Sequence, residues 1–192
     1  MKIQTLSEGR WTNTPPDFSF DGQILNVTTA LETDFWRGTH YGFFRDNGHF
    51  LGLPAPNSFT ATLTFDAKYQ ELYDQAGVML RVDDRNWIKL GVEHSDGVTN
   101  FSIVVTRDLS DWSVIPQPLV HGPQIVRLTR QGSAVIAHFQ AADGNWQLMR
   151  VANFPEGPAQ LGPMACSPSR AGLNVSFTEF SIGSVIENPL HG

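Results

Sequence analysis

The sequence predicts an all-β sandwich or barrel, and three observations support this prediction. Short runs of apolar or alternating residues recur along the chain, and turn pairs such as Asp96-Gly97 and Asp143-Gly144 separate them. Asp-Gly between two such runs is a strong signal for a tight hairpin turn. No segment carries apolar residues at the 3.6-residue spacing of an amphipathic helix. Short strands at regular spacing are typical of sandwiches and barrels.

Each expected strand is a run rich in β-branched and aromatic residues, bounded by turn chemistry. In chain order the expected strands are 23–29, 58–67, 76–82, 87–93, 101–107, 124–130, 134–141, 146–152 and 172–182. The clearest short-range hairpin joins 134–141 to 146–152, with Asp143-Gly144 at its tip.

Strand 87–93 predicts two unlike faces, because successive side chains of a strand point to opposite sides of the sheet. Ile88, Leu90 and Val92 form a dry face, and Trp87, Lys89 and Glu93 fall on the other. The same alternation puts Gln75, Met79 and Arg81 on this second face of the preceding strand. The second face is either a ligand-binding surface or an ordinary outer face whose tryptophan is covered by a loop.

The pairing register of these two strands can also be predicted. Both apolar sets share a face only if the numbers of opposed residues add up to an even value. One such register would oppose Arg81 to Lys89, a like-charge pair that is destabilising. We therefore predict the register that opposes Arg81 to Trp87, Met79 to Lys89 and Gln75 to Glu93, with a loop at 83–85.

Length and charge limit the class of protein. A chain of 192 residues fits a single domain, 1–192, with 186–192 expected to be a frayed tail. The net charge of −6 and the lack of Lys/Arg runs argue against nucleic acid or an anionic membrane as a partner. The single cysteine, Cys166, excludes an internal disulfide, and the first residues lack the apolar segment of a secretory signal. We expect a cytoplasmic protein.

The sequence offers little catalytic chemistry. No paired-carboxylate run of the kind that retaining glycosidases carry on one strand is present, although Asp34 could supply a second carboxylate near Glu93. The histidines are scattered without metal-ligand spacing, and nucleotide-binding and nucleophile motifs are absent. We expect no metal, no cofactor and no catalytic residue, and the question of enzymatic activity stays open, leaning towards none.

Several spaced motifs together resemble a known family. The pattern comprises Trp11, PP (15–16), DG (21–22), TDFW (33–36), HYGFFRDNGHFL (40–51), AGVMLRVDDRNWIKLGVE (76–93), WSV (112–114) and GPMACSP (162–168). It resembles an uncharacterised family of concanavalin A-like jelly rolls, one fungal member of which is named for regulation of enolase. The resemblance spans nearly the whole chain and implies a two-sheet antiparallel jelly-roll sandwich with one convex and one concave sheet.

In that fold the aromatic-rich stretch 34–51 would lie beside the concave sheet. Trp36, His40 and Tyr41 would reach the groove, while Phe43, Phe44 and Phe50 would anchor the loop into the core. The expected ligand-binding residues of the groove are Trp36, His40, Tyr41, Gln75, Arg81, Trp87, Lys89, Glu93 and Trp112.

These residues favour non-catalytic binding of a small carbohydrate, because aromatic platforms with a few convergent polar groups are typical of ligand sites. Arg81 and Lys89 would also suit a sugar acid or a phosphosugar. One alternative is a regulatory module that meets a protein partner or a second copy of itself. A further alternative is a glycoside hydrolase or lyase, which needs a second carboxylate or a His–Tyr pair near Glu93, with His40 and Tyr41 as the first candidates.

Overall fold

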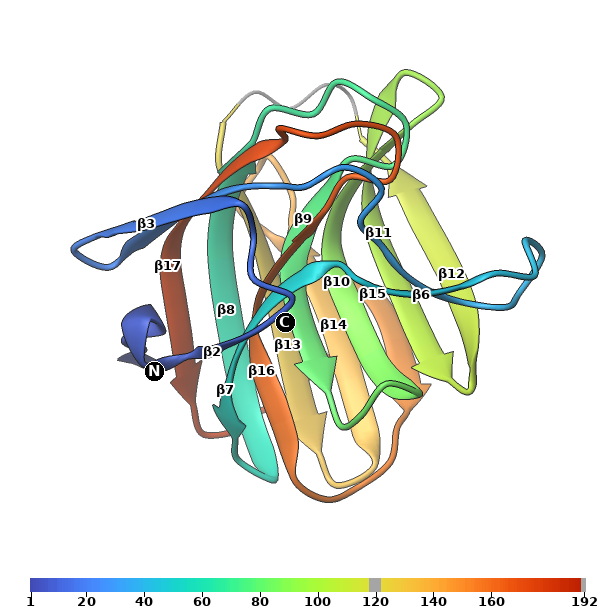
Figure 1. The fold of residues 1–192 in the computed structure, drawn as a ribbon. Helices are drawn as coiled ribbons and strands as arrows, with labels where there is room; N and C mark the ends of the chain where they lie inside the picture. The colour runs from blue at the N-terminus through green and yellow to red at the C-terminus, as the bar shows by residue number, and fades with distance from the viewer. Residues whose placement is uncertain (118–121, 191–192) are drawn as a thin grey trace.

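The computed structural model describes residues 1–117 and 122–190. These residues form two large antiparallel sheets and one small one, with a single short 3₁₀ helix at Leu6–Glu8. The prediction of an all-β jelly-roll sandwich is confirmed, and Figure 1 shows the two large sheets packed face to face.

The first large sheet, sheet A, runs in the order β15-β14-β13-β8-β17-β4-β3, and β1 pairs with β17. Its strands are β1 (Lys2–Ile3), β3 (Asp17–Asp21), β4 (Ile24–Thr28), β8 (Ser58–Ala67), β13 (Gln124–Gln131), β14 (Ala134–Gln140), β15 (Trp146–Asn153) and β17 (Asn174–Gly183).

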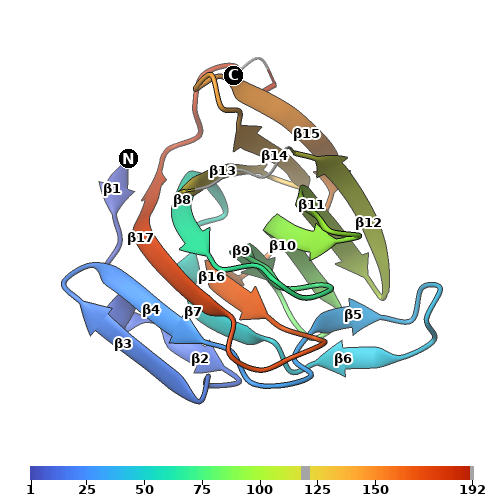
Figure 2. The ribbon, with the colours of Figure 1, turned by 90° about the horizontal axis from the view of Figure 1, so that it is seen from above.

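The second large sheet, sheet B, runs in the order β12-β11-β10-β9-β16-β7-β2. Its strands are β2 (Arg10–Thr12), β7 (His49–Ala55), β9 (Gln75–Arg81), β10 (Asn86–Ser95), β11 (Val98–Arg107), β12 (Leu109–Pro116) and β16 (Ala159–Cys166). Sheet A curves around sheet B, whose outer face is the one turned away from sheet A (Figure 2).

The small sheet covers part of this outer face. It pairs β5 (Phe35–Arg37) with β6 (Phe44–Asp46), and it lies against the outer face of sheet B beside β12 (Figure 2). We call this unit, residues 35–46, the cover hairpin. The resemblance implied a loop beside the concave sheet here, whereas the segment forms a sheet of its own.

The register predicted for the central strands is confirmed. Arg81 lies opposite Trp87, Met79 opposite Lys89, and Gln75 opposite Glu93.

The next turn, Asp96-Gly97, has positive φ at both residues, 53° and 76°. Such a turn matches the twist of the strands on either side, so β10 and β11 pair without a gap from Asn86↔Arg107 to Ser95↔Val98.

Two hydrophobic clusters stabilise the fold. The larger fills the space between sheets A and B and includes Ile88, Leu90 and Val92, the predicted dry face of β10. The smaller lies on the outer face of sheet B beneath the cover hairpin, and it contains Phe35, Trp36, Phe50, Met79, Trp87, Val104, Met164 and Cys166. Part of the outer face is therefore a second core.

All nine strands expected from the sequence are present, with ends within a few residues of the prediction. The strands outside those nine predicted ranges are β1, β2, β3, β5, β6, β7, β12 and β16. The expected frayed tail begins at Ile186, whose amide nitrogen donates to Thr60 Oγ1 at 3.1 Å. The final two residues of that tail lie outside the described residues.

Candidate functional site

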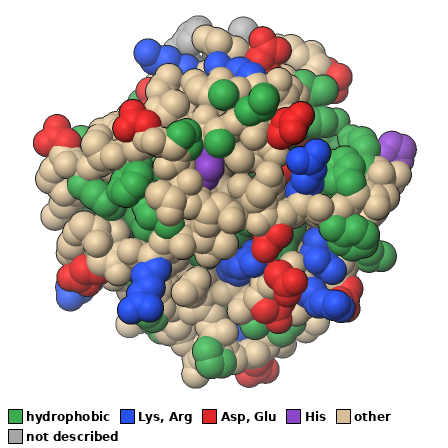
Figure 3. Space-filling model, viewed as in Figure 1, with side chains coloured by type: hydrophobic (Ala, Val, Ile, Leu, Met, Phe, Trp, Pro, Cys, Tyr) green, Lys and Arg blue, Asp and Glu red, His purple; other side chains and the backbone are tan. Residues whose placement is uncertain are grey.

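A pocket of about 240 Å³ opens on the outer face of sheet B. Its walls come from the cover hairpin, from β12 and from the loops that precede β9 and follow β16. Figure 3, in the same view as Figure 1, shows hydrophobic side chains gathered on the side of the molecule where the cover hairpin projects, with charged side chains next to them. The lining residues are Glu32, Asp34, Trp36, Tyr41, Phe43, Arg45, Tyr73, Gln75, Lys89, Glu93, Val104, Trp112 and Pro168.

The polar floor of the pocket follows from the strand register. Gln75 and Glu93 are cross-strand neighbours, and Lys89 follows on the same face of β10 because side chains alternate along a strand. The Lys89 ammonium donates to Gln75 Oε1 at 2.6 Å. Lys89 and Glu93 are both buried, with 4% and 5% of their surface exposed, so a ligand would meet them only through the pocket.

Asp34 brings a third charged group to this floor. Its Oδ1 accepts from Lys89 Nζ at 3.1 Å and from Gln75 Nε2 at 3.4 Å. The loop that carries Asp34 is fixed by Asn47, whose Oδ1 accepts from the Asp34 amide and whose Nδ2 donates to the Glu32 carbonyl. The pKa of Lys89 is raised although burial opposes its charge, because the Asp34 carboxylate outweighs that effect together with other anions nearby.

Glu93 is a buried carboxyl group that forms no ion pair with the described residues. Its Oε2 accepts from Ser102 Oγ at 2.9 Å, and that hydroxyl oxygen accepts from Trp112 Nε1 at 3.0 Å. Burial raises the pKa of Glu93 from 4.5 to about 7, against the lowering influence of Lys89 and of the Ser102 hydrogen bond. A carboxyl group with a pKa near neutrality can take up or release a proton at physiological pH.

Aromatic rings form two walls above this floor. On one side Trp36 meets Tyr41 edge to face at 5.7 Å, and Tyr41 stacks on Phe43 at 5.4 Å. On the other side Tyr73 meets Trp112 edge to face at 6.4 Å. The hydroxyls of Tyr41 and Tyr73 join the two walls at 2.8 Å, and this bond raises the pKa of Tyr73 to about 12.

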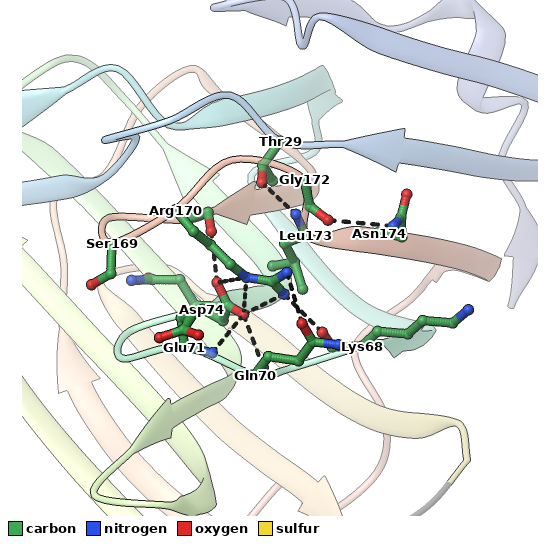
Figure 4. Close-up of polar contacts among 12 residues, drawn as sticks. Thr29, Lys68, Gln70, Glu71, Asp74, Ser169, Arg170, Gly172, Leu173 and Asn174 are labelled. Atoms are coloured by element: carbon green, nitrogen blue, oxygen red, sulfur yellow. Dashed lines mark hydrogen bonds and ion pairs between the residues drawn. The ribbon is translucent and has the colours of Figure 1, made fainter.

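Next to Tyr73 in the chain, Asp74 forms an ion-pair network with Arg170, which Figure 4 shows. Asp74, fully buried, accepts from the Arg170 guanidinium at 2.6 Å and from Ser167 Oγ at 2.6 Å. The Arg170 and Ser167 bonds, with backbone N–H donors, lower the pKa of Asp74 although burial opposes this. We call this network the Asp74–Arg170 clamp. It joins the loop of Tyr73 to the loop of Pro168, and Tyr73 itself has a positive φ of 65°, an uncommon conformation that such a clamp can hold.

Six of the nine predicted ligand-binding residues line the pocket. They are Trp36, Tyr41, Gln75, Lys89, Glu93 and Trp112. Their convergence on one cavity follows from the predicted face of β10, from the register with β9 and from the cover hairpin folding back over sheet B. The other three, Trp87, Arg81 and His40, do not line it.

Trp87 is the main correction. It lies on the predicted face of β10, but the cover hairpin buries it completely, with 0% of its surface exposed. The Phe35 ring lies 6.0 Å from the indole, and Gly48 allows this packing, since an added Cβ there would clash with the Phe35 ring. The covering loop that the sequence left open as an alternative is thus what the structure contains, and Trp87 offers no ring face to a ligand.

Arg81 and His40 depart from expectation for different reasons. Both terminal nitrogens of Arg81 donate to the two carboxylate oxygens of Asp46, at 2.7 and 2.8 Å, so its charge is used to fasten the cover hairpin to β9. His40 is exposed at the hairpin tip with φ of 61°, and its ring touches Tyr41 from outside the pocket, 4.8 Å between centroids. Arg81 and Lys89 therefore do not form the anion site that an acidic sugar would need.

Phe43 and Phe44 do not anchor the cover hairpin in the core, as the resemblance implied. They are 40% and 59% exposed, whereas Phe35 of the hairpin and Phe50 of β7 are both fully buried and belong to the same hydrophobic cluster. The sequence reasoning also missed Glu32, Phe43, Arg45, Tyr73, Val104 and Pro168 as pocket residues, and it considered Asp34 only as a second carboxylate. Val104 could have been found by strand alternation, since it lies opposite Lys89.

Other chemistry has little support in the residues that the structure describes. Within 1–117 and 122–190, no three His, Cys, Asp or Glu side chains gather as a metal site would require. Burial raises the pKa of the Cys166 thiol far above its usual range, which disfavours the reactive thiolate. None of the helical structure in these ranges is long and apolar enough to cross a membrane.

Known proteins are similar to this chain in fold, and some of them also in sequence. Regulation of enolase protein 1 of Saccharomyces cerevisiae is 40% identical over 195 residues, covering 99% of this chain and 96% of the relative. A crystal structure of a functionally unknown protein from the same yeast superposes with a TM-score of 0.91 at 39% identity, covering 96% of this chain and 100% of the other. A legume lectin-like domain from Entamoeba histolytica shares the fold, with a TM-score of 0.65, 9% identity and coverage of 94% and 92%. The family model described as "Protein of unknown function (DUF1349)" matches residues 11–185, and the chain belongs to this family.

Proposed function

We propose that this protein binds a small carbohydrate in the pocket beside the cover hairpin, without catalysis. The observation that carries the proposal is the convergence of two aromatic walls on a polar floor of Gln75, Lys89 and Glu93. Sugar rings have apolar faces that pack on aromatic rings and hydroxyls that both donate and accept hydrogen bonds. The site offers surfaces for both.

The size of the pocket supports a small ligand. Pockets for drug-sized molecules run from about 300 to 1,000 Å³, and this one encloses about 240 Å³. One sugar ring or a comparable polyol matches that space better than an oligosaccharide. The jelly-roll fold shared with a legume lectin-like domain is compatible with this proposal, but a likeness at 9% identity concerns the fold alone.

The pairing of Lys89 and Arg81 with carboxylates argues against a sugar acid or phosphosugar as the ligand. Lys89 is paired with Asp34, and Arg81 is paired with Asp46 outside the pocket. A carboxylate or phosphate on the ligand would also approach the buried Glu93 carboxylate. Like charges at short range in a poorly solvated site repel strongly.

Titration of the protein with D-glucose, D-galactose, D-mannose and D-xylose, followed by ligand-observed NMR, tests the proposal. At least one should bind, and Trp112→Ala should weaken its binding at least tenfold because one aromatic wall is lost. Trp146→Ala is the matched control, since Trp146 stacks on Arg127 in sheet A, 4.3 Å from the guanidinium carbon to the ring centroid. Equal loss in both variants, or no binding of any sugar, would contradict the proposal.

A glycoside hydrolase is the second candidate, and one observation favours it. Asp34 and Glu93 line the same pocket, and Glu93, with its pKa of about 7, can hold a proton at neutral pH. One protonated and one charged carboxyl group is the arrangement that glycoside hydrolysis uses. Release of nitrophenol from nitrophenyl glycosides, lost in Glu93→Gln, would establish turnover and replace the binding proposal.

A regulatory interaction with a protein partner, or a homodimer, stays a prediction, as does the cytoplasmic location. The name of the yeast relative concerns regulation of enolase and is said of that protein. The surface most suited to a partner here is the tip of the cover hairpin, where Tyr41, Phe43 and Phe44 are each at least 40% exposed.

A further inference from the structure

Some polar atoms of the pocket already have hydrogen-bond partners, and others have none. Lys89 already donates to Asp34 and Gln75, and the Gln75 amide nitrogen donates to Asp34 and to the Tyr73 carbonyl. By contrast, within the described residues no hydrogen bond reaches Oε1 of Glu93 or Oδ2 of Asp34, since the bonds to these carboxylates end on Oε2 and Oδ1. The two carboxylates on the pocket floor therefore each have an oxygen that is free to accept a hydrogen bond.

The charges that line the pocket also favour a ligand that donates hydrogen bonds and carries positive charge. Three carboxylates line it (Glu32, Asp34 and Glu93), against two cations, Lys89 and Arg45. Asp34 and Lys89 pair with each other, with only 14% and 5% of their side chains exposed. With Glu93 ionised, the deepest unpaired charge is negative, and the surrounding aromatic walls screen it poorly from a ligand.

The aromatic walls also favour a positively charged group in the pocket. The faces of Trp and Tyr rings attract cations, and the attraction grows where the cation is desolvated. Trp36 with Tyr41, and Tyr73 with Trp112, each meet edge to face, so rings of different orientation border the same small space. A positively charged group there would contact ring faces and the Glu93 carboxylate together.

We propose that the preferred ligand is a sugar ring bearing a protonated amine, with the ammonium held between Glu93 and the aromatic walls. This inference rests on the proposed function and specifies its ligand class. An ammonium supplies up to three donors and no acceptor, which suits the unused oxygens of Glu93 and Asp34. Lys89 does not oppose such a ligand strongly, because Asp34 neutralises it at 3.1 Å.

A charge series on one ring tests the inference directly. D-glucose, 6-amino-6-deoxy-D-glucose and D-glucuronate carry a neutral, a positive and a negative group at the same carbon, and D-glucosamine places the amine at a second position. Calorimetric titration at pH 7.5 should show one of the two amino sugars binding at least tenfold more tightly than glucose, with glucuronate the weakest. Glu93→Gln should bring the ratio of amino-sugar to glucose affinity towards one.

Glu179→Gln is the matched control, because Glu179 is exposed on β17 of sheet A and should leave that ratio unchanged. Glucose that binds as tightly as both amino sugars, or glucuronate that binds more tightly, would overturn the charged-ligand inference and leave carbohydrate binding standing. The inference also fails if the ratio survives in Glu93→Gln. Absence of binding by all four compounds would overturn the proposed function and the inference together.

Discussion

The outer face of sheet B has two halves that differ in access to solvent, although the same strands build both. Trp87 and Lys89 lie two residues apart on β10 and point to the same side. Trp87 is covered by Phe35 and belongs to a second hydrophobic cluster, whereas Lys89 lines an open pocket. Strand alternation thus decides which face a residue occupies, and the path of the cover hairpin decides whether that residue can meet a ligand.

The largest expected effect is a loss of stability on removing the Trp87 side chain from the covered half. Trp87→Ala removes a fully buried side chain beneath Phe35, and the cavity should lower the free energy of unfolding by about 3–5 kcal/mol. Urea denaturation followed by circular dichroism measures this loss. Trp87→Phe should cost much less, because the indole N–H has no hydrogen-bond partner among the described residues.

The matched substitution in the open half is Trp112→Ala. Trp112 is 37% exposed and contributes one hydrogen bond to Ser102, so its loss should cost clearly less stability than the loss of Trp87. If the two variants were equally unstable, the division of the face into a covered and an open half would be wrong. A stable Trp87→Ala protein would contradict it as well.

The open half is supported by the Asp74–Arg170 clamp, which lies outside sheet B, and Arg170→Ala tests this support. The substitution leaves the buried Asp74 carboxylate without its charged partner, which should lower the free energy of unfolding by about 3 kcal/mol. Arg85→Ala is the control, since Arg85 and Asp108 form an ion pair with 62% and 73% of their side chains exposed, and exposed pairs contribute about 1 kcal/mol or less. Similar losses in the two variants would show that the clamp is not a buried support.

The covered and the open half also differ in how far their structure can be predicted from the sequence. The face of Trp87, Lys89 and Glu93 follows from strand alternation, and the register follows from excluding the Arg81–Lys89 contact, so both were predictable. Each rests on local rules that hold for any antiparallel pair. The residues of the polar floor can therefore be placed on one face from the sequence alone.

The cover over Trp87 could not be found in this way. It depends on where residues 35–46 cross sheet B, which is a long-range arrangement fixed by Phe35, by the space at Gly48 and by the Arg81–Asp46 pair. The run HYGFFRDNGHFL has no simple period, so its buried and exposed aromatics could not be told apart. Tyr73 was missed because its place in the pocket depends on a positive φ and on the Asp74–Arg170 clamp, and neither has a local sequence signal.

The smallest expected effect separates the two halves by pH, because Glu93 in the open half titrates near neutrality. Its pKa is about 7 in the folded protein and 4.5 when unperturbed, so between these values the folded state holds a proton that the unfolded state has released. The stabilisation from this proton is complete below pH 4.5 and is lost as the pH rises through 7. The free energy of unfolding of the native protein, measured relative to Glu93→Gln, should therefore fall by about 2–3 kcal/mol between pH 5 and pH 8. Ser102→Ala removes a hydrogen bond that lowers this pKa, so it should move the transition to higher pH, and a difference that stays flat with pH would show that Glu93 is solvated like an ordinary surface carboxylate.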